Sequence, residues 1–283
     1  MTGLVAQQQC VGPLQLPLAD VGVVAQSHFT TRGIASACGE QPIKGLVSPS
    51  AMGRMVVAEM LTNLIWAKLS ALEHVKASGN WMWAAKLSGE GPRMWDACTA
   101  LKDAMLAVGV GIDGGKDSLS MAAAVDEEVV RAPGMLTLTA YCTCEDVTLT
   151  VTPDLKMPGQ SQLIFIDLQP SLPGGTASGR RLGGTALAQV FGQLGDSCPD
   201  MDFPGGDWTP FVAAFNAVQN LIGGRHVLAG HDRSDGGLLV AVLEMAFAGN
   251  CGGWCPVLPP PCLDSSREDH SLSFVICLPF ALV

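Results

Sequence analysis

One segment constrains the fold more than any other. Residues 52–72, MGRMVVAEMLTNLIWAKLSAL, are mostly apolar and repeat with the period of an α-helix. Within them Glu59 and Asn63 recur at helical spacing among Met, Val, Leu and Ile. A helix that is apolar on most of its surface has to be covered by other elements. The segment therefore predicts a helix that packs on other elements of the fold.

The flanking segments supply candidates for the covering elements. A strand is predicted at 16–25, a second helix at 92–109 and a β-branched strand within 135–151. Residues 152–159, with two prolines and a glycine, read as a linker. A second alternation follows, with strands at 162–168 and 226–230 and helices within 183–195, 211–224 and after 231–237. The order predicts an α/β (α+β) protein with a domain at 1–155, a second at 156–253 and a tail at 254–283.

Composition excludes several function classes. The chain has 283 residues, about two domains in length, and 48% of them are hydrophobic. A formal net charge of −10 argues against a nucleic-acid-binding surface, which would carry clustered Lys and Arg. No apolar run reaches membrane-spanning length, and the N-terminus has no signal-peptide pattern, so a cytoplasmic protein is expected. The ten scattered cysteines are interpreted as reduced thiols.

Carboxylates inside apolar elements mark the candidate sites. Glu59 and Asn63 lie one helical turn apart, so both oxygens project from one face; a solvated helix rim is the alternative. Asp20 is interpreted as the end of an apolar strand, or else as a cap. The strongest candidate is HDRSDGG at 231–237, which places charged and hydroxyl groups between a strand and a helix.

The stretch GIDGGKDS, residues 111–118, is not a phosphate-binding loop. Such a loop needs a glycine five residues before Gly115 and Ser or Thr after Lys116, whereas the chain has Val110 and Asp117. We interpret the stretch as a tight turn, in which Lys116 is a candidate contact for an anion.

Several runs together carry a resemblance to a known family. They include VAQQQCVGPLQLPLADVGVV, GEQPIKGL, VAEMLTNLIWA, ASGNWMWAAKLSGEG, RLGGTALAQVFGQLGD and HDRSDGGLLVAVLEMAFAGNCG. The chain resembles phosphoribosylformylglycinamidine synthases of the large, single-chain type, from Thr2 to about Gly253, over the second synthetase repeat of that family. The resemblance implies a two-domain unit like aminoimidazole ribonucleotide synthetase.

The resemblance also implies a function. The family uses ATP and glutamine to convert formylglycinamide ribonucleotide to its amidine in de novo purine synthesis. Ala19 and Ser234 match nucleotide-contacting positions for ATP or ADP. Asp20, Glu59, Asn63 and Asp232 match the positions of Mg²⁺ ligands, and oxygen ligands suit that cation.

The departures from the family lead to a second hypothesis. The first synthetase repeat and the glutaminase domain, expected partners of this region, are not in the sequence. After Gly253 the chain no longer resembles the family, and four prolines fall within 256–261. We therefore expect an irregular, weakly packed tail that adds no strand to the second domain. The alternative to a half-site of a ligase is a non-catalytic truncated isoform or interaction fragment.

Overall fold

The computed structural model describes residues 3–168, 181–251 and 273–279. No helix among them is long and apolar enough to cross a membrane. The larger sheet has the strand order β1-β2-β3-β8-β4-β5. Its strands are β1 (Val5–Gln7), β2 (Gly22–Ala25), β3 (Gly33–Glu40), β8 (Met135–Cys144), β4 (Lys76–Met82) and β5 (Gly111–Ser118). Only β4 and β5 pair in parallel in this sheet, and β6 (Ala122–Val125) and β7 (Glu128–Arg131) form a separate hairpin.

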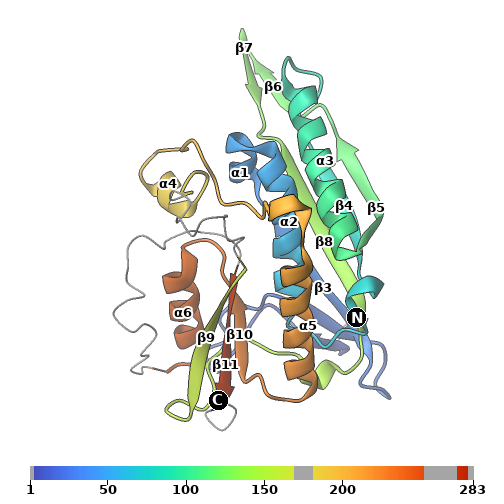
Figure 1. The fold of residues 1–283 in the computed structure, drawn as a ribbon, viewed down its shortest axis with the longest axis vertical. Coiled ribbons are helices and arrows are strands. Elements are labelled where there is room, and N and C mark those ends of the chain that lie inside the picture. The colour runs from blue at the N-terminus through green and yellow to red at the C-terminus, as the bar shows by residue number, and fades with distance from the viewer. Residues whose placement is uncertain (1–2, 169–180, 252–272, 280–283) are drawn as a thin grey trace.

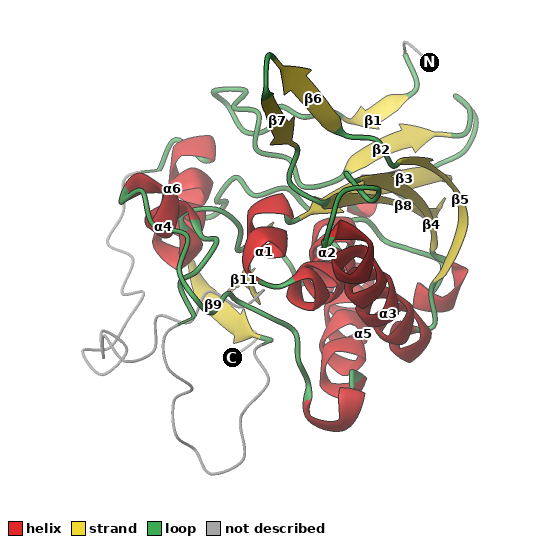
Figure 2. Ribbon diagram, turned by 90° about the horizontal axis from the view of Figure 1, so that it is seen from above, coloured by secondary structure: helices red, strands yellow, loops and turns green. Residues whose placement is uncertain are grey.

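Helices cover one face of the larger sheet, as Figure 2 shows from above. They are α1 (Pro42–Val47), α2 (Pro49–Leu64) and α3 (Glu90–Val108), and α5 (Thr209–Gly223) packs on these helices on the side away from the sheet. Along β3 and β8, buried and more exposed residues alternate, so every second side chain packs toward the helices. At Gly39 a Cβ would come within 2.5 Å of the Val56 carbonyl oxygen, so a glycine is needed where β3 and α2 pack this closely. The helix expected at 52–72 is thus confirmed as α2, which ends at Leu64, before the end of the expected range.

The central helix begins with defined capping. The Ser48 side chain accepts a hydrogen bond from the Ala51 amide at 3.2 Å, and Pro49 occupies the first turn, where its missing N–H costs nothing. At the other end, Gln219 of α5 donates to the carbonyls of Ile65 and Ala67. The cap at the start of α2 and the Gln219 hydrogen bonds just after its end hold in place the helix that carries Glu59. Three short 3-10 helices complete this part: Leu72–His74, Val147–Leu149 and Pro204–Gly206.

The smaller sheet corrects the expectation for the tail. Its order is β10-β11-β9, with β9 (Ser161–Asp167), β10 (Ala229–Asp232) and β11 (Ser273–Pro279) all antiparallel to their neighbours. The expectation of an irregular, weakly packed tail without a strand is therefore wrong for residues 273–279; residues 252–272 lie outside the described part. Figure 1 shows β11 between β9 and β10, beside α6 (Gly237–Ala248).

The burial of β11 explains why a strand forms there. Val275 and Cys277 pack with Met245 of α6, while Ile276 and Leu278 join the larger core. A strand that is covered on both faces needs a continuous apolar run. The FVICL stretch is such a run, and the prolines at 256–261 precede the strand without interrupting it.

Two local expectations are also wrong. GIDGGKDS forms β5 and not a tight turn, because it pairs in parallel with β4 from Lys76 to Met82. Gly115 has φ +147, and a Cβ there would lie 1.9 Å from the Gly79 carbonyl oxygen, so the glycine allows the two strands to approach. Asp20 does not end a strand; it lies in a bend two residues before β2. The helix expected within 183–195 is short, α4 (Ala186–Val190).

Candidate functional site

Two carboxylates that are far apart in the sequence meet at one point. Asp20 precedes β2, Asp232 ends β10, and the ligand atoms of Asp20, His231 and Asp232 all lie within 4.8 Å of one another. The amide of Asp232 donates to Oδ2 of Asp20 at 3.3 Å. Nδ1 of His231 lies 2.9 Å from Oδ1 of Asp20 and 3.5 Å from Oδ1 of Asp232. Nε2 of His231 lies 3.1 Å from Oε2 of Glu244 on α6.

This cluster is buried, and burial changes its titration. The side chains of Asp20, His231 and Asp232 are 6%, 5% and 4% exposed. Burial raises the pKa of Asp20 and, with the Asp20 charge added, raises the pKa of Asp232 well above its usual range. Burial alone would lower the pKa of His231, but the Asp20 charge and the hydrogen bonds to Asp20 and Glu244 raise it to about 10. Two carboxylates that lie this close together and away from water repel each other, and a bound cation would reduce that repulsion.

Glu59 lies within electrostatic reach of the same cluster. Its charge helps to raise the pKa of Asp232, after burial and the Asp20 charge, while the His231 charge lowers that pKa. Burial raises the pKa of Glu59 itself to about 7 against hydrogen bonds from Gln41 and the Glu40 amide, the latter at 2.6 Å. The nearby buried Lys44, which donates to Oε1 of Gln41, has a pKa lowered by burial. Glu59 is therefore a partly buried, hydrogen-bonded carboxylate and not a solvated helix rim.

The other expected positions make different contacts. Nδ2 of Asn63 donates to the Cys38 carbonyl at 3.0 Å, a turn further along α2 than Glu59. The Ala19 amide donates to the Gln9 carbonyl next to Asp20. Ser234 is exposed, two residues beyond Asp232. The structure thus brings Asp20, Asp232 and Glu59 into one electrostatic group, and the ligand roles of Asn63, Ala19 and Ser234 stay predictions.

Sequence reasoning missed Glu244 and gave His231 no role of its own. His231 stood out as part of its motif, and Glu244 did not stand out. A signal for Glu244 was present, because it is the one carboxylate in the apolar helix GLLVAVLEMAFA, as Glu59 is in α2. The interpretation of Lys116 as an anion contact stays a prediction; its Nζ lies 2.5 Å from Oγ of Ser118 on exposed β5.

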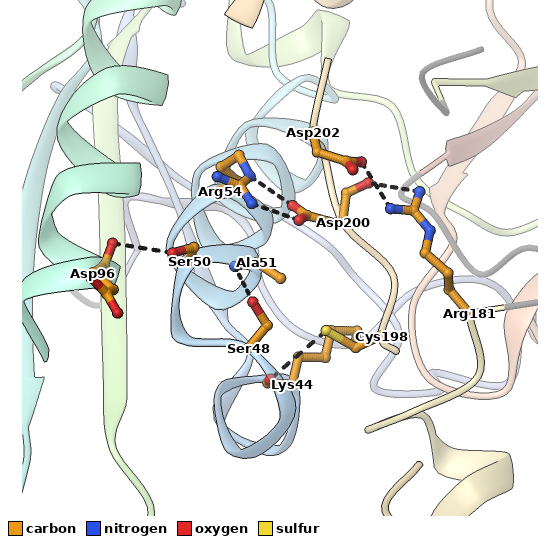
Figure 3. Close-up of polar contacts among 10 residues, drawn as sticks. All are labelled: Lys44, Ser48, Ser50, Ala51, Arg54, Asp96, Arg181, Cys198, Asp200 and Asp202. Carbon is orange, nitrogen blue, oxygen red and sulfur yellow. Dashed lines mark hydrogen bonds and ion pairs between the residues drawn. The ribbon is translucent and has the colours of Figure 1, made fainter. Parts of the chain in front are cut away.

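An ion-paired junction, shown in Figure 3, fixes α2 against the segment that follows α4. Arg54 makes a bidentate contact with Asp200, with Nε at 2.7 Å and the terminal nitrogen at 2.6 Å. Arg181 donates to Oδ1 of Asp202 at 2.8 Å. The Cys198 thiol lies 3.9 Å from the Lys44 carbonyl oxygen. Because Glu59 lies on α2 and Asp232 in the second half of the chain, this junction helps to set their separation.

Comparisons with known proteins agree on one family. Residues 1–143 match the model described as "FGAR-AT PurM_N-like domain", and residues 174–271 match "AIR synthase related protein, C-terminal domain". The second match continues past Gly253, where the sequence was expected to leave the family, so that expectation is corrected. The domain boundary at residue 155 stays a prediction.

Curated relatives carry the same name. A human phosphoribosylformylglycinamidine synthase is 57% identical over 251 residues, which cover 88% of this chain and 18% of the relative. The synthase of Schizosaccharomyces pombe is 41% identical over 281 residues, 95% of this chain and 20% of the relative. The Arabidopsis thaliana protein "Probable phosphoribosylformylglycinamidine synthase, chloroplastic/mitochondrial" is 60% identical over 253 residues, 89% of this chain and 17% of the relative. The chain spans a fifth or less of their length.

Solved structures show the fold. "T. maritima PurL complexed with FGAR" matches with a TM-score of 0.61 at 13% identity, covering 99% of this chain and 41% of that one. "T. maritima PurL complexed with ATP" matches with a TM-score of 0.56 at 13% identity, covering 88% and 36%. The mixed α/β fold expected from the order of elements is confirmed.

Proposed function

The chain belongs to the phosphoribosylformylglycinamidine synthase family, and from this premise we propose that it carries a nucleotide and magnesium half-site of that ligase. The ligase would use ATP and glutamine to convert formylglycinamide ribonucleotide to formylglycinamidine ribonucleotide in purine biosynthesis. The observation that supports the proposal most is the meeting of Asp20 and Asp232, two carboxylates with buried side chains that come from distant parts of the sequence. Burying two neighbouring carboxylates without a ligand costs free energy, so the pair favours a bound cation.

The proposed ligands are Asp20, Glu59, Asn63 and Asp232 for Mg²⁺, with Ala19 and Ser234 contacting ATP or ADP. The residues fit the cation, because a hard cation prefers carboxylate and amide oxygens and would offset the repulsion within the cluster. When bound, Mg²⁺ would neutralise the charge of nucleotide phosphates. The protein contributes rigid placement: Asp232 through β10, Glu59 through α2, and Asp20 through the bend before β2.

Thermal unfolding with Mg²⁺ and ADP tests this half-site. We expect the melting temperature to rise only when both are present, by an amount equivalent to about 2.7 kcal/mol at 100 times the dissociation constant. Asp232→Asn removes one of the proposed carboxylate ligands, so the ligand-induced rise should disappear. Asp103→Asn, at an exposed position on α3, is the matched control and should keep the full rise. A wild-type protein that does not respond to Mg²⁺ and ADP would contradict the proposal.

These 283 residues alone are not expected to make product. Catalysis requires several groups held together, and the matched region is a fifth or less of the relatives. We therefore propose that the first synthetase repeat and a glutaminase domain are its partners. Product formed by the isolated chain from ammonia and ATP would refute this. A cytoplasmic location also stays a proposal, since the name of the plant relative places that protein in organelles.

The alternative is a non-catalytic fragment that docks on the partner repeat. The sheet face opposite α2 favours this hypothesis, because a partner could cover it. The outward residues of β3 are exposed there, and Ile34 is 58% exposed. Analytical gel filtration of the chain with a synthase lacking its second repeat distinguishes the two. Docking with no Mg²⁺–ADP response would favour the fragment hypothesis.

A further inference from the structure

The His231 ring has a carboxylate at each of its nitrogen atoms. Nδ1 faces Oδ1 of Asp20 at 2.9 Å, and Nε2 faces Oε2 of Glu244 at 3.1 Å. A ring nitrogen that donates a hydrogen bond has no lone pair left for a metal ion. Because an ionised carboxylate only accepts hydrogen bonds, each ring nitrogen is placed to donate, and this placement favours a donor over a metal ligand although Nδ1 lies within the cluster.

Asp20 is held less firmly by its own backbone than Asp232 and Glu59 are, so it depends more on side-chain contacts for its orientation. Asp232 is held by the backbone pairing of β10 with β11, and Glu59 by the helical turns of α2 that precede it. Asp20 lies in a bend outside any strand or helix. Nδ1 of His231 lies 2.9 Å from Oδ1 of this carboxylate and 3.2 Å from Oδ2, and the Asp232 amide donates to Oδ2 at 3.3 Å, so the ring and the amide together fix its direction.

Glu244 completes the arrangement from the other side. It projects from α6, which lies beside β10 (Figure 1), and its side chain is 33% exposed, so it reaches the ring from the rim of the buried cluster. With Nε2 engaged by Glu244, the ring can turn only by losing one of its two contacts. Glu244 thus sets the orientation of His231, and His231 sets the orientation of Asp20.

We propose that His231 and Glu244 are positioning residues that hold the Asp20 carboxylate in the geometry needed by a divalent cation. This rests on the metal site proposed above. Groups that orient metal ligands through hydrogen bonds commonly account for about 10- to 100-fold in metal affinity. Here the usual order is reversed, because the histidine orients a carboxylate ligand.

Two substitutions at His231 separate the two contacts. His231→Asn places an amide nitrogen close to the position of Nδ1 and keeps a donor for Asp20. His231→Gln places its amide nitrogen close to the position of Nε2 and keeps only the donor for Glu244. With Mn²⁺ as the probe, measured by electron paramagnetic resonance with ADP present, we expect affinity to fall about 10- to 100-fold in His231→Gln and to recover largely in His231→Asn. Equal affinities in wild type and His231→Gln would overturn the proposal.

Glu244→Ala provides a test that does not alter the buried ring. It should weaken Mn²⁺ binding in the same direction as His231→Gln but less, because the Nδ1 contact remains. His74→Gln, at an exposed histidine that contacts Ser70, is the matched control and should bind Mn²⁺ as wild type does. Unchanged binding in Glu244→Ala would remove Glu244 from the proposal.

A spectroscopic measurement distinguishes positioning from ligation. In protein labelled with ¹⁵N-histidine, electron spin echo modulation of bound Mn²⁺ should show no directly coordinated nitrogen. Direct coordination would overturn the positioning role and leave the metal site intact. If wild type bound no Mn²⁺ at all, the proposed function and this inference would fail together, whereas binding that depends on Asp20 but not on His231 would contradict the inference alone.

Discussion

Glu59 shows how burial changes the chemistry of one residue. Its pKa is about 7 in the folded protein, against 4.5 for an unperturbed glutamate, so between these pH values the folded state binds more protons than the unfolded state. The free energy of unfolding contributed by Glu59 is therefore lost as the pH rises from about 4.5 to about 7. Glu59→Gln removes this dependence.

We expect Glu59→Gln to gain up to about 3 kcal/mol relative to wild type on going from about pH 4.5 to about pH 8. Urea unfolding without metal, measured for both proteins across this range, gives the difference directly and cancels the titration of other groups. Glu128→Gln, at an exposed position, should track wild type throughout. A pH-independent difference between Glu59→Gln and wild type would show that Glu59 does not titrate there.

The site residues differ in how far sequence could find them. Glu59 was found from the sequence because a carboxylate at helical spacing among apolar residues is visible along the chain. The meeting of Asp20 with Asp232 was expected only through a family resemblance, since no local pattern connects residues so far apart. The roles of His231 and Glu244 were missed because they depend on which atoms face each other, and spacing carries no such information.

At the scale of elements, β5 and β11 were misread because local composition was given more weight than pairing. Two adjacent glycines favour a turn, but in β5 they let the strand approach β4. Prolines favour an irregular tail, but in this chain they precede the apolar strand. The long helices α2, α3 and α5 were predicted because their periodicity extends over several turns.

The β4–β5 contact predicts a large cost for Gly115→Ala. The new Cβ would meet the Gly79 carbonyl oxygen, and the φ of +147 disfavours any side chain, so we expect a loss of about 3 kcal/mol in the free energy of unfolding. Gly111→Ala is the matched control in the same strand, since a Cβ there meets nothing within 4 Å. Chemical denaturation compares the two, and equal stabilities would contradict the close approach of the two strands.

The burial of β11 predicts that it is essential to the smaller sheet. Ile276→Ala removes a side chain that is 2% exposed and joins the larger core, so a loss of about 2–5 kcal/mol is expected. Val129→Ala, where the valine is 54% exposed on β7, should cost less than about 0.5 kcal/mol. Denaturant midpoints for both variants test this. If Ile276→Ala were as stable as wild type, the earlier expectation of a weakly packed tail would be supported.

At the scale of the whole molecule, side-chain contacts join the two halves of the chain. The Arg54–Asp200 pair is bidentate and its side chains are 26% and 11% exposed. A double-mutant cycle with Arg54→Ala and Asp200→Ala should give a coupling energy of about 1–3 kcal/mol. The Lys102–Asp103 pair, at 2.8 Å but more than half exposed, is the control and should couple by less than about 0.5 kcal/mol. Similar couplings would mean that the junction contributes little to the placement of α2.

The central position of β11 also has a consequence for the order of folding. Asp167 and Ser273 are neighbours in the smaller sheet, and β9 and β10 touch only through β11, so that sheet cannot close until the last strand has emerged from the ribosome. All strands of the larger sheet precede residue 145, and its β2–β3 hairpin joins Ala25 to Gly33 across a short loop, which closes faster. We expect pulse-labelled hydrogen exchange during refolding to protect amides of β2 and β3 before those of β9. Until then Asp232 would lack its ordered strand, and a metal ion present during synthesis would meet an unfinished site.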